Sequence, residues 1–241
     1  MAFSLSIVMF AFNEEENLGP VVGEAVEALD RLVGEGRLSD WQLVLLDDGS
    51  SDGTYAKICA LAAETPKILP MTHGTNRGIG AAVKTGFAAT VMDYVSILPA
   101  DGQVTVGELA KLIPAVEAGA DMALGYYTQR GQVDGGLRLF LSKGLRQVMR
   151  LALGTQRPMD GVYMFRRTML RALPLKSETF FVNLELPVRA MRAGYDVRSV
   201  PVEVHARLSG SSKVLGLTRI ARVGGEVLKF RANLIVEAME R

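Results

Sequence analysis

The chain has 241 residues, of which 49% are hydrophobic and 22% charged, so it is long enough to bury a large core and is not mainly disordered. Its single cysteine, Cys59, excludes an internal disulfide and indicates a reducing compartment; because it lies in an apolar helical stretch, we expect a core thiol. No run of about 18 apolar residues predicts a membrane span, and no basic region precedes the first apolar run. We therefore expect a cytoplasmic protein, soluble or peripheral on the cytoplasmic face of a membrane.

The net charge of +1 conceals two halves of opposite sign. Residues 1–125 contain 7 Lys and Arg against 17 Asp and Glu, a charge of −10, whereas residues 126–241 contain 20 against 9, a charge of +11. This asymmetry predicts different ligands for the two halves. A basic half fits phosphate groups, an anionic membrane or nucleic acid. Nucleic acid is disfavoured, because only 7% of the residues are aromatic and they do not alternate with basic residues.

Short apolar runs alternate with segments of helical periodicity in the first half. This pattern predicts a doubly wound, mostly parallel α/β sheet flanked by helices, with a ligand at the carboxyl ends of its strands. We expect strands over Leu5–Phe10, Trp41–Leu46, Ile68–Met71, Tyr94–Leu98 and Asp121–Tyr126, and helices over Glu14–Val33, Tyr55–Ala63 and Val106–Ala118.

Polar and acidic residues follow three of these strands directly. Asn13 and Glu14 follow the first strand, Asp47 and Asp48 end the second, and Asp101 follows the fourth. Each has an ordinary structural explanation: Asn13 is a plausible helix N-cap, and the acids fit turns rich in Asp, Gly and Ser. Their repeated position at strand ends instead favours a ligand site, where a carboxylate accepts hydrogen bonds from a nucleoside or holds a cation.

The segment from His73 to Gly86 opens the helix that follows the third strand. Its glycines allow the backbone to approach a ligand closely, and Arg77 or Lys84 could contact phosphate. The spacing matches neither a Walker loop nor a dinucleotide fingerprint, so alone it is a weak signal.

The second half combines basic helices with two further strands. Glu185 lies in an apolar helical segment and requires a partner, such as Arg189 one turn later, or a functional role. We expect helices over Leu137–Leu153, Phe180–Arg192 and, as an amphipathic pair, Leu215–Arg241, with strands over Val162–Phe165 and Val197–His205.

Several motifs, in this order, resemble those of the inverting family 2 glycosyltransferases with the GT-A fold, and of the dolichyl- or polyprenyl-phosphate sugar synthases in particular. The similarity covers nearly the whole chain. The motifs are Ala11-Phe-Asn-Glu14, Leu46-Asp-Asp-Gly-Ser-Ser-Asp-Gly-Thr54, Asn76-Arg-Gly-Ile-Gly80, Ala100-Asp-Gly-Gln103, Gly161-Val-Tyr-Met-Phe-Arg-Arg167 and Arg207-Leu-Ser-Gly-Ser-Ser-Lys213.

The resemblance implies a role for each matching residue. Asp101 and Gln103 would hold Mg²⁺ or Mn²⁺ on the donor diphosphate. Base, ribose and phosphates of the donor would be bound by Ala11, Asn13, Glu14, Asp47, Asp48, Arg77 and Gly78. Phosphate would be engaged by Arg130 and Arg138 of a mobile loop and by a basic segment containing Arg207, Ser211 and Lys213.

Two departures concern the donor and the cation. Pro99 stands where the family's Asp-x-Asp motif has its first Asp, and Phe10 and Phe12 replace the usual Pro and Tyr of the first motif. The first change removes one cation ligand, and the second removes a hydroxyl near the base.

The resemblance implies inverting transfer of a hexose from a UDP- or GDP-hexose to a polyprenyl phosphate, with a membrane surface or membrane subunit as a further partner. The alternatives are a family 2 transferase acting on a sugar or protein hydroxyl, and a nucleotide-sugar-binding protein with impaired catalysis. We expect a transferase domain over residues 1–213, with a nucleotide-sugar half at 1–125 and an acceptor half at 126–213, followed by a helical tail at 214–241.

Overall fold

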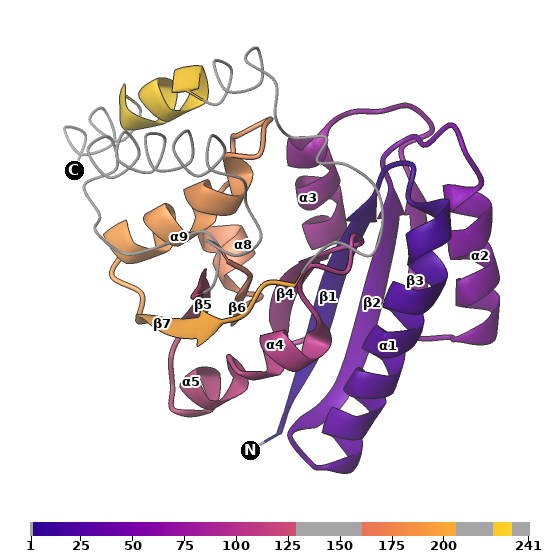
Figure 1. Ribbon diagram of the computed structural model, residues 1–241. Helices are drawn as coiled ribbons and strands as arrows, with labels where there is room; N and C mark the ends of the chain where they lie inside the picture. The colour runs from indigo at the N-terminus through magenta and orange to yellow at the C-terminus, as the bar shows by residue number, and fades with distance from the viewer. Residues whose placement is uncertain (1, 129–160, 206–223, 233–241) are drawn as a thin grey trace.

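A seven-stranded sheet forms the centre of the computed structural model, which describes residues 2–128, 161–205 and 224–232 (Figure 1). The strand order is β3-β2-β1-β4-β6-β5-β7, and only β6 runs antiparallel to its neighbours β4 and β5. The strands are β1 (Phe3–Ala11), β2 (Leu38–Asp47), β3 (Ile68–Thr72), β4 (Tyr94–Pro99), β5 (Met122–Tyr127), β6 (Tyr163–Arg166) and β7 (Val197–Val202). The predicted mostly parallel α/β sheet is therefore confirmed.

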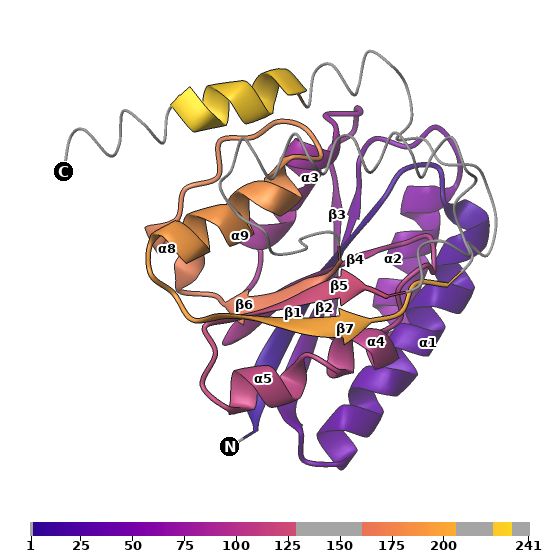
Figure 2. The ribbon, with the colours of Figure 1, turned by 60° about the vertical axis from the view of Figure 1, so that its left-hand side comes forward.

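Helices cover both faces of the sheet (Figure 2). Successive side chains of a strand point to opposite faces, so Ile7 packs with α1, α4 and α5 in one core cluster, while Val8 packs with α3, α8 and α9 in the other. The helices are α1 (Glu15–Gly34), α2 (Thr54–Glu64), α3 (Ile79–Ala88), α4 (Val106–Ala110), α5 (Ile113–Glu117), α8 (Met169–Ala172) and α9 (Val182–Arg192).

The register of the parallel strands brings their carboxyl ends together. Ala11 of β1 pairs with Asp47 of β2, and Asp47 pairs with Thr72 of β3. On the other side of β1, Phe10 pairs with Pro99 of β4. The turns that follow β1, β2 and β4 therefore leave the sheet at one edge, as the sequence predicted.

The helix expected over Val106–Ala118 is wrong as a single element, because α4 and α5 are separate. Pro114 has no N–H to donate to the carbonyl of Ala110. That carbonyl instead accepts a hydrogen bond of 3.1 Å from the Arg37 guanidinium. The helix is thus interrupted before Pro114, while the freed carbonyl of Ala110 keeps a partner.

Two smaller expectations are also wrong. Cys59 is exposed rather than buried, because α2 buries Thr54 and Ile58, one turn apart, and the next residue points about 100° away from them. Asn13 is not the N-cap of α1; Glu14 occupies that position, and its side chain makes no capping hydrogen bond. The backbone of Asn13 has φ of 53°, which Asn tolerates better than most residues.

A helix at residues 224–232 packs against α9. Val227 and Phe230 form a small core with Phe181, Leu184 and Val188. In α9 the predicted pair of Glu185 and Arg189 is confirmed, with 2.8 Å between carboxylate and guanidinium Nε. Within the described ranges, no helix combines the length and the apolar character needed to cross a bilayer.

Candidate functional site

The turn after β1 is joined to the turn after β2 by hydrogen bonds. The backbone N–H of Asn13 donates to the Ser50 hydroxyl at 2.9 Å, and the Asn13 side-chain oxygen accepts from the N–H of Ser51 at 2.9 Å. The N–H of Glu14 donates to the Thr54 hydroxyl at 2.9 Å. Asn13 and Glu14 therefore stand beside the acidic segment of the second motif, where the sequence placed them.

Asp52 orders the start of α2 through hydrogen bonds to Thr54. Its carboxylate accepts from the hydroxyl of Thr54 at 2.5 Å and from the N–H of Thr54 at 3.0 Å. Partial burial works against the charged form, but these hydrogen bonds outweigh it and hold the pKa of Asp52 below its ordinary value. Asp52 is thus a structural acid of the motif.

Asp47 and Asp48 are both buried at the end of β2 and both accept hydrogen bonds within the protein. Asp47 accepts from the N–H of Ser50 at 3.1 Å and from the hydroxyl of Thr72 at 3.0 Å. Asp48 accepts from the N–H groups of Arg77 and Gly78 at 3.0 and 2.9 Å. Because the two carboxylates bind different segments, each retains its own set of donors.

Residues 73–78, which we call the glycine loop, lie against the turn after β2. A Cβ atom built on Gly49 would lie 2.2 Å from the carbonyl carbon of Thr75, so only glycine fits there. The glycine loop ends at Gly78, whose φ of 85° favours glycine, and α3 begins at the next residue. Arg77 is exposed at this junction, next to the strand ends.

The turn after β4 carries the predicted cation ligands. The Asp101 carboxylate accepts from the N–H of Gln103 at 3.1 Å across Gly102, whose φ is 70°. The carbonyl of Gln103 accepts from the N–H of His205 at 2.9 Å. Because of this hydrogen bond, the segment after β7 reaches the same edge as Asp101. Asp101 and Gln103 are both partly exposed there.

One carboxylate and one amide oxygen fit a hard divalent cation only if other oxygens complete its shell. In the parts of the chain that the structure describes, no three His, Cys, Asp or Glu residues form a group that could hold a metal ion. Mg²⁺ commonly takes one or two carboxylates, with substrate phosphates and water as the remaining ligands. The residues at the Asp101 turn fit that arrangement, with the Asp101 carboxylate as the charged ligand.

Not every predicted residue can be placed at this edge. Four basic residues expected to engage phosphate lie outside the described residues: Arg130, Arg138, Arg207 and Lys213. The same holds for the expected helix over Leu137–Leu153 and for most of the tail Leu215–Arg241.

Two members of the glycine-rich segment have structural roles. Lys84 pairs with Glu178 at 2.7 Å, and a Cβ on Gly80 would lie 2.3 Å from the Glu178 backbone. This glycine therefore allows protein packing rather than the approach of a ligand.

His73 is the main residue of this edge that sequence reasoning did not single out. Its Nδ1 lies 2.7 Å from the Asp48 carboxylate and its Nε2 lies 3.0 Å from the Thr85 hydroxyl. Its position directly after β3 was the available signal, since the same rule had identified Asn13 and Asp101.

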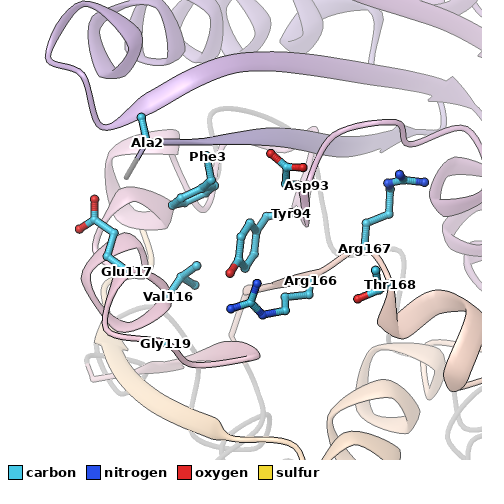
Figure 3. Close-up of a pocket in the computed structure, with 10 residues that line it drawn as sticks. All are labelled: Ala2, Phe3, Asp93, Tyr94, Val116, Glu117, Gly119, Arg166, Arg167 and Thr168. Carbon is cyan, nitrogen blue, oxygen red and sulfur yellow. The ribbon is translucent and has the colours of Figure 1, made fainter.

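A separate cavity of about 480 Å³ lies at the opposite edge, where β1 and β4 begin (Figure 3). Arg166 stacks over the Tyr94 ring with 5.3 Å between guanidinium carbon and ring centroid, and pairs with Asp121 at 3.3 Å. The Nε of Arg167 donates to the carbonyl of Met92 at 2.8 Å. None of the predicted site residues lines this cavity.

Comparison with known proteins agrees with this arrangement. The family model of glycosyl transferase family 2 matches residues 6–173. The polyprenol monophosphomannose synthase of Mycolicibacterium smegmatis is 32% identical over 87% of this chain and 80% of its own length. The dolichol-phosphate mannosyltransferase of Pyrococcus furiosus is 29% identical over 89% of this chain and 60% of its own length.

Solved structures share the fold. Glucosyl-3-phosphoglycerate synthase from Mycobacterium tuberculosis, in complex with Mn²⁺, UDP-glucose and phosphoglyceric acid, superposes with a TM-score of 0.70 at 22% identity, covering 95% of this chain and 80% of that one. A structure of the same synthase with Mg²⁺ and UDP gives the same TM-score. The chain therefore belongs to glycosyl transferase family 2, and it is a glycosyltransferase with the GT-A fold.

Proposed function

We propose that this glycosyltransferase transfers a hexose from a nucleotide-sugar, a UDP- or GDP-hexose, to a polyprenyl phosphate such as dolichyl or undecaprenyl phosphate. The observation that carries this proposal is the likeness, over 87% of the chain, to a relative named polyprenol monophosphomannose synthase. Relatives named dolichol-phosphate mannosyltransferase and dolichyl-phosphate β-glucosyltransferase support the same acceptor class.

The donor would lie across the carboxyl ends of β1, β2 and β4. Ala11, Asn13, Glu14, Asp47 and Asp48 would face its nucleoside, and Arg77 and Gly78 would lie beside it at the start of α3. The presence of UDP in the solved neighbours supports a uridine nucleotide. Exposed Arg77 places positive charge beside this edge, where it would stabilise the diphosphate as it leaves. We propose that Arg130, Arg138, Arg207 and Lys213 add to that charge.

Asp101 and Gln103 would hold a divalent cation, Mg²⁺ or Mn²⁺. Such a cation neutralises negative charge on a diphosphate leaving group. The Asp101 turn would place its carboxylate toward the donor, since Gly102 bends the chain directly after β4. Because Pro99 supplies no oxygen ligand from its side chain, cation binding should be weak until the donor is present.

The proposed reaction is a single displacement with inversion. An oxygen of the acceptor phosphate forms a bond to the anomeric carbon while the bond from that carbon to the diphosphate breaks, and the nucleoside diphosphate leaves with the electron pair. The acceptor oxygen is already anionic at neutral pH, so no general base is needed; a hydroxyl acceptor would need one.

A polyprenyl acceptor lies in a bilayer, so the active site must meet a membrane. We propose peripheral attachment on the cytoplasmic face, directly or through a membrane subunit, with residues 126–213 as the acceptor half and 214–241 as a helical tail. The basic charge of residues 126–241, +11, supports this orientation.

The test is transfer of labelled hexose from UDP- and GDP-sugars to undecaprenyl or dolichyl phosphate in detergent, with Mg²⁺, with Mn²⁺ and with chelator. We expect an organic-extractable product that requires the lipid phosphate, because the unphosphorylated polyprenol lacks the anionic nucleophile. Product on a soluble hydroxyl acceptor alone would overturn the proposal in favour of a hydroxyl-acting transferase. Donor binding without transfer or hydrolysis under any cation would indicate a binding protein.

The variant Asp101→Asn should abolish transfer while the protein remains folded. Its matched control is Asp196→Asn. This change removes a surface carboxylate that pairs with Arg198 at 2.6 Å and lies directly before β7, at the end of that strand away from the donor site. Transfer retained by Asp101→Asn would refute the assignment of the cation to this turn.

A further inference from the structure

Asp48 binds the glycine loop with nearly all of its acceptor capacity. A carboxylate offers about four acceptor positions, and three of them receive the N–H groups of Arg77 and Gly78 and the Nδ1 of His73. Its side chain is only 7% exposed. The orientation of the Asp48 carboxylate is therefore set largely by the glycine loop.

His73 connects Asp48 to α3. The backbone N–H of His73 donates to the carbonyl of Asp47 at 3.0 Å, which fixes the residue at the end of β3. Its side chain is 4% exposed and bridges the Asp48 carboxylate at 2.7 Å and the Thr85 hydroxyl at 3.0 Å. The two ring nitrogens thus link the segment after β2 to α3 through one side chain.

The glycine loop needs such a restraint. Residues 74–77 are exposed, and Gly74 and Gly78 have φ angles of 69° and 85°. A segment with two glycines loses much conformational freedom when it is ordered. The hydrogen bonds at Asp48 hold its far end, and the close fit of Gly49 against Thr75 supports its middle.

We propose that His73 is a positioning residue, which fixes the Asp48 carboxylate and, through it, holds the glycine loop in the conformation that binds the donor. This inference rests on the proposed function, since it assumes that a nucleotide-sugar lies at this edge. Binding then requires no ordering of the loop, so removal of the restraint should weaken donor binding through Arg77 and Gly78.

The test uses three variants of the full chain. His73→Ala removes both bridges, Thr85→Val removes one while keeping the shape, and His73→Asn retains an N–H donor near the place of Nδ1. We expect His73→Ala to raise the donor KM and the dissociation constants of UDP or GDP about tenfold, which corresponds to about 1.4 kcal/mol. We expect kcat to change less, Thr85→Val to have a smaller effect and His73→Asn to recover most of the loss.

Amide hydrogen exchange provides a readout independent of catalysis. In His73→Ala, the amides of Arg77 and Gly78 should exchange about tenfold faster, because their hydrogen bonds to Asp48 open locally. The control is Ser96→Ala, which deletes a buried hydrogen bond of 2.7 Å to the Tyr163 carbonyl in the middle of the sheet. It should lower stability without altering nucleotide affinity or exchange at the glycine loop.

Unchanged nucleotide affinity and unchanged exchange in both His73→Ala and Thr85→Val would overturn the inference. An equal loss of affinity in Ser96→Ala would also overturn it, because the effect would then follow general stability. If the wild-type chain binds nucleotide as described but transfers nothing to lipid phosphate, the proposed acceptor fails while the role of His73 stands.

Discussion

Gly80, the second residue of α3, lies against the backbone of the segment before α9, and its replacement by alanine should destabilise the fold. A Cβ at this position would lie 2.3 Å from the carbonyl carbon of Glu178 and 2.4 Å from its oxygen. Ordinary contacts of this kind are longer by about 1 Å, so one of the two backbones would have to move by that amount.

The backbone around Glu178 cannot move freely. The Glu185 carboxylate accepts from the N–H of Ser177 at 2.8 Å, and the Glu226 carboxylate accepts from the N–H of Glu178 at 2.9 Å. Overpacking of a fixed site costs about 1–3 kcal/mol. In a domain of this size each kcal/mol lowers Tm by about 2–4 °C, so we expect Tm to fall by about 2–12 °C in Gly80→Ala.

The matched control is Gly23→Ala in α1. Gly23 is an exposed helical glycine, and a Cβ there would meet nothing within 4 Å. Alanine should stabilise that helix by up to about 1 kcal/mol. Thermal unfolding followed by circular dichroism compares the Tm of the two variants. If Gly80→Ala proves as stable as Gly23→Ala, the segment around Glu178 does not pack on α3, and the reasoning is refuted.

Three further changes test other contacts, each by the free energy of unfolding. Gly49→Ala and Gly36→Ala both force alanine into a positive φ, but only Gly49 contacts the glycine loop. Gly49→Ala should therefore lower the free energy of unfolding by about 1–3 kcal/mol more than Gly36→Ala, and equal losses would contradict that packing. Partial burial of Glu226 favours its neutral form, but hydrogen bonds outweigh this and hold the pKa of Glu226 below its ordinary 4.5. Above pH 4.5 the free energy of unfolding of wild type should therefore exceed that of Glu226→Gln by about 1 kcal/mol, and the difference should disappear as pH falls through the folded pKa. A difference that does not depend on pH would contradict this. Glu185→Ala leaves the buried Arg189 without its ion-pair partner and should cost about 3–5 kcal/mol, whereas a loss under 1 kcal/mol would show that the pair is dispensable.

The sequence predicted the sheet well because its signals are local. A short apolar run followed by Asn13, Asp48 or Asp101 marks both a buried strand and the edge at which it ends. The same local reasoning failed at α4 and α5, where periodicity continues through Pro114 although the missing N–H divides the helix. Periodicity reports which face is apolar, and it does not report whether each backbone hydrogen bond can form.

Partnership between distant residues could not be predicted in the same way. The residues of the pair Asp48 and His73 are 25 positions apart, and their contact depends on the register of β2 and β3.

Strand-end acids are therefore ambiguous as ligands until their hydrogen bonds are known. Asp47, Asp48 and Asp101 look alike in sequence, yet they differ in surroundings: Asp48 is buried with three donors from the glycine loop, whereas Asp101 is partly exposed beside Gly102. A carboxylate whose acceptor positions are filled by backbone N–H groups shapes a loop, and one that remains accessible can bind a cation. By that criterion we propose that Asp48 orders the wall of the donor site and that Asp101 supplies the charge that holds its cation.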